Sequence, residues 1–103
     1  MLSFLKNLFS TQPQADLGEL IQKGATIIDV RSKGEFQGGH LKGSINIPLK
    51  NLSEHISKIK KDKPVITCCA SGARSGAAKS ILKANGFEAY NGGPWTNLRK
   101  YMG

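Results

Sequence analysis

The segment CASGARS, residues 69–75, combines a cysteine with small residues and a cation. Ser71 and Gly72 allow the backbone to curl so that its N–H groups face inward, and the dipole of a following helix adds positive potential. Together with the guanidinium of Arg74, these groups favour negative charge on the sulfur of Cys69. We therefore expect Cys69 to be a reactive thiolate whose pKa lies below that of an ordinary thiol.

The elements that position this segment alternate between strand and helix. Short runs rich in β-branched or aromatic residues predict strands over 26–30, 45–47, 64–69 and 87–90. Apolar residues at helical spacing predict helices that start at Leu17 and stop at Gly24, over 49–59, over about 74–85, and around Leu98. The fold class is therefore α/β, a mostly parallel central sheet with helices on both faces. Cys69 closes the third strand, at the end of the sheet where ligands bind.

Two local patterns refine this assignment. Residues 34–43 form a Gly-rich segment in which no helix is predicted, and Pro48 ends the second strand. In the helix predicted over 49–59, Asn51 and Glu54 are spaced like an N-cap and its reciprocal acceptor.

Composition limits the classes of function. With 103 residues, 39% of them hydrophobic, the chain is expected to form one folded domain, and no apolar run is long enough to span a bilayer. The net charge of +8 favours anionic partners. We expect no nucleic-acid binding, because the densest basic stretch, residues 58–63, has no interleaved aromatic residues. The two cysteines, adjacent at 68 and 69, exclude a disulfide framework or a four-ligand zinc site and favour a reducing compartment, which points to the cytoplasm.

Residues 1–14 differ in character from the rest of the chain. Their apolar residues have the spacing of a short amphipathic helix, followed by a linker from Thr11 to Gln14. Lys6 interrupts the apolar core that a secretory signal needs, so a helix packed on the domain, or one that touches a membrane, is favoured. The domain itself is expected over 15–103.

Three stretches together resemble a single-domain rhodanese, a thiosulfate sulfurtransferase. They are DVRSKGEFQGGHLKGSINIP at 29–48, CASGARS at 69–75 and NGGPW at 91–95, in the order and spacing of that family. The resemblance implies a rhodanese-like fold and a Cys69 that takes a sulfane sulfur, becomes a persulfide and passes the sulfur to an acceptor. It implies no cofactor and no metal. The expected partners are a small anionic donor, thiosulfate or a persulfide, and a thiol or protein acceptor.

The remaining residues of the loop are expected to bind the substrate through the loop's backbone amides and the guanidinium of Arg74. They are Ala70, Ser71, Gly72, Ala73, Arg74 and Ser75. Their amides would hydrogen-bond the outer sulfur of the persulfide, so that no general base is needed once the loop has lowered the thiol pKa. Arg74 is interpreted as an anion-binding residue, with pairing to a carboxylate as the alternative. Ser71 and Ser75 either cap the helix or hydrogen-bond the sulfur.

Loop length separates the related activities that the resemblance implies. From Cys69 to Arg74 is six residues, the size associated with sulfurtransferases, whereas phosphatases and arsenate reductases of similar fold carry one more. Ala70 stands where a familiar rhodanese loop often has a basic residue, so one positive side chain is lost from the rim. A binding or regulatory module is the other alternative, although such modules typically lack the loop cysteine.

Residues outside the loop are expected to be structural. Cys68 should point to the opposite face of the sheet, into the core. The resemblance implies that Asp29, Arg31 and Glu35 support the loop from behind through ion pairs and hydrogen bonds. Of the remaining candidates, His40 is expected to satisfy backbone groups, His55 to be exposed to solvent, and Trp95 to pack near the site.

Overall fold

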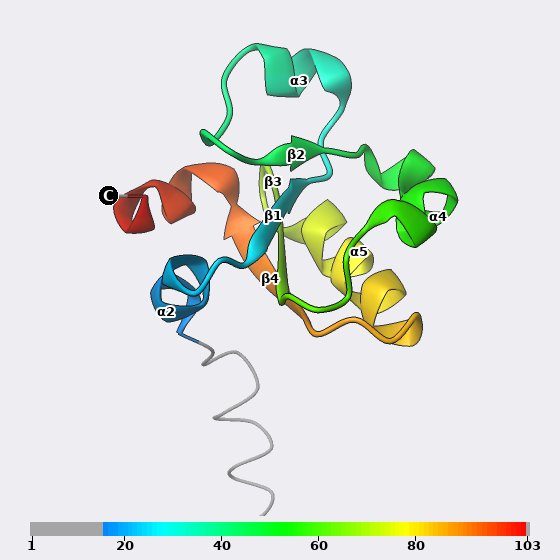
Figure 1. Cartoon of the computed structure of the whole chain (residues 1–103). Helices are drawn as coiled ribbons and strands as arrows, with labels where there is room; N and C mark the ends of the chain where they lie inside the picture. Colours follow the sequence, from blue (N-terminus) through cyan, green and yellow to red (C-terminus); the bar gives the residue numbers. More distant parts are fainter. Residues whose placement is uncertain (1–15, 103) are drawn as a thin grey trace, which may run out of the picture.

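The computed structural model describes residues 16–102, and the amphipathic segment and linker predicted over 1–14 lie outside the described residues. A parallel four-stranded sheet in the order β2-β1-β3-β4 forms its centre (Figure 1). The strands are β1 (Thr26–Asp29), β2 (Ile45–Asn46), β3 (Val65–Cys69) and β4 (Ala89–Pro94). β1 and β3 are buried almost throughout, as their β-branched composition requires. The predicted α/β fold class is confirmed.

Helices cover both faces of the sheet, and each cover has its own apolar cluster (Figure 1). On one face lie η1 (Leu49–Asn51), α4 (Leu52–His55), η2 (Ile56–Lys58) and α5 (Ala73–Ala84). On the other face lie α2 (Leu17–Gln22) and η3 (Trp95–Tyr101). Within residues 16–102, no helix has the length and apolar character needed to cross a membrane.

The register of the sheet brings three strand ends to one edge. Asp29 pairs with Cys68, and Cys69 pairs with Pro94 across an irregularity between Thr67 and Cys69. The loops after β1, β3 and β4 therefore meet at the carboxyl edge, where a site in this type of fold is expected.

Helix α3 (Lys33–Gln37) corrects the sequence analysis, which predicted no helix in the Gly-rich segment 34–43. A capping box starts it: the Ser32 hydroxyl accepts from the Glu35 amide at 3.2 Å, and a Glu35 carboxylate oxygen accepts from the Ser32 amide at 3.0 Å. These two hydrogen bonds satisfy amides at the start of the helix, which offsets the poor helix propensity of Gly34.

Three other boundaries also differ from the predictions. The helix expected over 49–59 is a short α-helix between two 3-10 turns, and Asn51 makes no side-chain cap there. The last strand runs from Ala89 to Pro94 rather than from 87 to 90, and the terminal helix is a 3-10 helix. The extension of β4 matters for function, because it brings Asn91 beside the loop at residues 69–75.

Candidate active site

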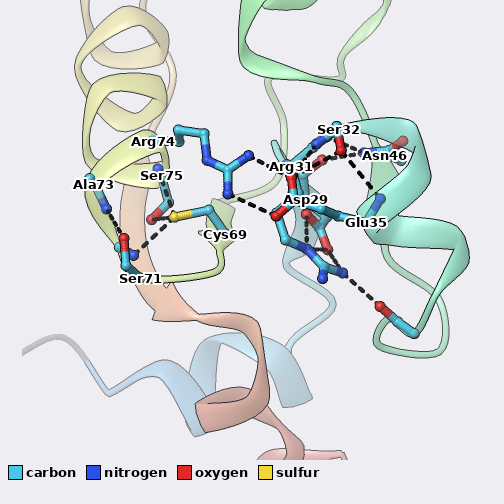
Figure 2. Close-up of polar contacts among 12 residues, drawn as sticks. Asp29, Arg31, Ser32, Glu35, Asn46, Cys69, Ser71, Ala73, Arg74 and Ser75 are labelled. Atoms are coloured by element: carbon cyan, nitrogen blue, oxygen red, sulfur yellow. Dashed lines mark hydrogen bonds and ion pairs between the residues drawn. The ribbon is translucent and has the colours of Figure 1, made fainter.

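Cys69 is the last residue of β3 and is fully buried. Its Sγ accepts the backbone N–H of Gly72 at 2.9 Å and that of Ser75 at 3.4 Å, and it lies 3.3 Å from the Ser75 hydroxyl (Figure 2). The loop therefore wraps around the sulfur and presents hydrogen-bond donors to it, which is the arrangement of an anion cradle.

The backbone of the loop explains how these donors converge. Gly72 has φ of 104°, a left-handed conformation that residues with a side chain rarely adopt, and it is the N-cap of α5. Ser75 lies in the first turn of α5, where backbone N–H groups have no partner within the helix. Two amides at the start of α5, those of the N-cap Gly72 and of Ser75, are thus turned toward Cys69.

The two cysteines differ in acidity. Burial acts to raise the pKa of Cys69, but the contact with the Ser75 hydroxyl and hydrogen bonds from the Ser75 and Gly72 amides outweigh it, so that the pKa lies below its ordinary value. Burial, together with the nearby carboxylate of Asp29, raises the pKa of Cys68 to about 12. Cys68 packs in the cluster on the opposite face of the sheet, and both thiols are free. Only Cys69 has the environment of a nucleophile.

Arg74 has a different partner from the one the sequence analysis favoured. Its guanidinium forms a bidentate pair with Glu35, with Nη1 to Oε1 at 2.7 Å and Nη2 to Oε2 at 3.1 Å (Figure 2). Hydrogen bonds from Arg74 and Ser32 lower the pKa of Glu35 to about 2. The structure therefore shows the alternative of the sequence analysis, pairing to a carboxylate: Arg74 ties the loop to α3, and the donors directed at the Cys69 sulfur come from other residues of the loop. Anion binding by Arg74 stays a prediction.

A buried ion pair lies behind the loop at the end of β1. Arg31 Nη2 is 2.7 Å from Asp29 Oδ2, and both side chains are almost completely buried. The same Nη2 donates to the carbonyl of Gly39 at 2.7 Å, and the guanidinium stacks 4.7 Å from the centre of the Trp95 ring. Since a buried charge needs a partner and hydrogen bonds, this arrangement fixes the segment that carries Glu35.

Asn91 is the residue at the site that sequence reasoning missed. Its Oδ1 accepts from the Ser75 hydroxyl at 2.6 Å and from the Gly93 amide at 2.8 Å, while its Nδ2 donates to the Gly72 carbonyl at 3.1 Å. It therefore holds the loop at both of the residues that contact the sulfur. The signal was present in the motif NGGPW, which begins with this asparagine.

The structure also shows the positions of the other residues that the sequence analysis singled out. Ala70, Ser71 and Ala73 are exposed, and the Ser71 hydroxyl accepts the Ala73 amide at 3.5 Å, which makes Ser71 a weak helix cap. The Nδ1 of His40 is 2.8 Å from the backbone carbonyl oxygen of Phe36, and the imidazole stacks on the Phe36 ring. His55, expected to be exposed, is half-buried beside the carbonyl of Asn51.

The family model described as rhodanese-like domain matches residues 13–93 of the chain. The chain belongs to the rhodanese-like domain family. This rhodanese-like chain is 47% identical over 68 residues to the uncharacterized protein YqhL of Bacillus subtilis, a match over 65% of the chain and 54% of YqhL. It is 30% identical over 79 residues to the thiosulfate sulfurtransferase GlpE of Pseudomonas savastanoi, over 77% of the chain and 74% of GlpE. The chain thus spans about half the length of the first of these relatives and about three quarters of the second.

A solved structure described as rhodanese with anions from E. coli superposes on this rhodanese-like domain with a TM-score of 0.69 at 35% identity. The match covers 74% of this chain and 93% of that one. The agreement extends the family assignment from sequence to three-dimensional structure.

Proposed function

We propose that the chain is a sulfurtransferase in which Cys69 carries a sulfane sulfur as a persulfide and passes it to cyanide or to a thiol. The observation that carries this proposal is the hydrogen-bonded position of the Cys69 sulfur, with amide donors from Gly72 and Ser75 directed at it. The names of moderately similar relatives, such as GlpE, support it.

The chemistry follows from the cradle. With thiosulfate as donor, the Cys69 thiolate attacks the outer sulfur, a Cys69–sulfur bond forms, the S–S bond of thiosulfate breaks, and sulfite leaves with the electron pair. The negative outer sulfur of the persulfide then lies where backbone N–H groups stabilise charge, as an oxyanion hole does for oxygen. Because the loop lowers the pKa of Cys69, the proposed reaction needs neither histidine as a base.

Two properties of the site support this activity over its alternatives. The loop keeps its cysteine, which a purely binding module does not need. Six residues from Cys69 to Arg74 suit a sulfane sulfur rather than the larger tetrahedral oxyanion of a phosphatase or arsenate reductase. Two adjacent free cysteines also suit a reducing environment, so we propose that the protein works in the cytoplasm.

Intact-protein mass spectrometry tests the proposal. After exposure to thiosulfate the protein should gain the mass of one sulfur atom, and cyanide should remove it. The adjacent cysteines provide a matched pair of variants: Cys68→Ser should keep the adduct, and Cys69→Ser should lose it. An adduct that persists in Cys69→Ser and disappears in Cys68→Ser contradicts the assignment of the nucleophile.

A further inference from the structure

An open cavity of about 980 Å³ lies between α3, β2 and η1, and it reaches the catalytic loop at Arg74. Its size is at the upper end of the range for small-molecule sites, which is about 300 to 1,000 Å³. Cyanide and thiosulfate are far smaller than this, so the cavity has room for a larger molecule next to the loop that carries Cys69.

The walls of the cavity have two kinds of chemistry. Phe36, Pro48 and Leu49 provide apolar surface, and Lys33 and Lys50 add two exposed ammonium groups. Among the described residues that line the cavity none is acidic. Within residues 16–102, neither lysine has an ion-pair partner, whereas the third cation of the lining, that of Arg74, is held by Glu35. The cavity therefore complements a molecule with an apolar body and an anionic group.

We propose that this cavity binds the sulfur acceptor, and that the acceptor is a small organic thiol that carries a carboxylate. The inference rests on the proposed function, since it names the acceptor for the Cys69 persulfide. Phe36 and Leu49 pack against the body of the acceptor, and Lys33 and Lys50 bind its carboxylate. Arg74 lines the cavity and belongs to the loop that starts at Cys69, so an acceptor bound in the cavity lies against this loop.

The transfer step is balanced without any further reactant. The outer sulfur of the persulfide takes the proton of the acceptor thiol, the resulting acceptor thiolate attacks that sulfur, and a new S–S bond forms on the acceptor. The S–S bond to Cys69 breaks, its electron pair returns to Sγ, and the proton leaves with the acceptor persulfide. The Cys69 thiolate that results is the form that the Gly72 and Ser75 amides stabilise.

The test compares N-acetylcysteine with its amide, which has the same shape and no carboxylate. The protein is first loaded with sulfur, and kcat/KM for transfer to each acceptor is measured. Lys33→Gln/Lys50→Gln should lower the preference for the acid by about fivefold, the loss expected for a partly solvated charge contact. Lys58→Gln, an exposed lysine of η2 outside the cavity lining, is the matched control and should keep the wild-type preference. Because preferences are compared between variants, the different thiol acidities of the two acceptors cancel.

A second readout does not depend on sulfur transfer. N-acetyl-S-methylcysteine cannot accept sulfur, and its binding is followed by NMR shifts of Phe36 and Leu49, with its amide as the control ligand. Binding of the acid alone supports the inference even if Cys69 takes no sulfur, in which case only the proposed function fails. An unchanged preference in the double lysine variant, or shifts that are equal for acid and amide, overturns the inference.

Discussion

The Ser75 hydroxyl lies 2.6 Å from Asn91 Oδ1 and donates its proton to that oxygen. The same hydroxyl is 3.3 Å from the sulfur of Cys69. Because a hydroxyl has one proton, the Asn91 carbonyl and the Cys69 thiolate compete for it. The acidity of the nucleophile therefore depends on a residue of β4 that does not touch the sulfur.

Asn91→Asp should raise the pKa of Cys69. A carboxylate at this position holds the Ser75 proton more strongly, adds negative charge near the thiolate, and cannot donate to the Gly72 carbonyl. Alkylation of Cys69 by iodoacetamide at neutral pH should slow by about tenfold, in line with the loss of a hydrogen bond to a charged group. Peptide mapping of Cys69 across pH measures this, with Asn85→Asp at the end of α5 as the control. An unchanged profile would show that Ser75 acts on the sulfur independently of Asn91.

Gly72→Ala should destabilise the fold and impair sulfur loading together. The left-handed φ of Gly72 costs a side-chain-bearing residue about 1 kcal/mol or more, and relief of that strain moves the amide away from Cys69. Gly34→Ala is the matched control, because Gly34 is helical and a methyl group there meets nothing within 4 Å. Urea denaturation and mass spectrometry measure the two effects. Equal stability of the two variants contradicts the role given to Gly72.

The Arg74–Glu35 pair should contribute to stability only above acid pH. The pKa of Glu35 is about 2 in the folded chain, against an ordinary value of 4.5. Between pH 2 and 4.5, Glu35 therefore binds fewer protons in the folded chain than in the unfolded chain. The contribution is therefore complete above about pH 4.5 and is lost as pH falls toward 2. Both side chains are more than a third exposed, so salt should weaken it. NMR titration of the Glu35 carboxyl, with Arg74→Met as the comparison, is the measurement; a midpoint near 4.5 in the wild type would refute the pairing.

Aryl phosphates should not be hydrolysed by the protein. The loop from Cys69 to Arg74 has six residues, a length that suits a sulfane sulfur, whereas phosphatases of similar fold are expected to carry one more residue to admit a tetrahedral oxyanion. A colorimetric assay with p-nitrophenyl phosphate checks this. Hydrolysis that disappears in Cys69→Ser would favour the phosphatase alternative.

Local patterns predicted most of the fold, because buried parallel strands are short and rich in β-branched residues. The strands at Thr26–Asp29 and Val65–Cys69 lie where those patterns placed them, and so does the long helix α5. Helix α3 was missed because Gly34 and the glycines that follow the helix outweigh the capping box of Ser32 and Glu35 when only composition and periodicity are considered.

Local sequence patterns did not predict the contacts in the site between residues that are far apart in the sequence. Arg74 and Glu35 are 39 residues apart, and nothing in their spacing indicates that they meet. The contact of Asn91 with Ser75 depends on where β4 ends, a boundary that propensity places poorly because Gly92 and Gly93 are weak strand formers. The cysteine and its small-residue loop, by contrast, lie within seven consecutive residues and were recognised from sequence.

Trp95 gives the protein an intrinsic fluorescent reporter. It is the chain's single tryptophan, and the guanidinium groups of Arg31 and Arg99 each lie over its ring, 4.7 Å from the ring centre. It directly follows Pro94, the residue paired with Cys69 in the sheet. Its emission therefore comes from one defined environment next to the strand position of Cys69, and we expect that emission to change when Cys69 takes up sulfur.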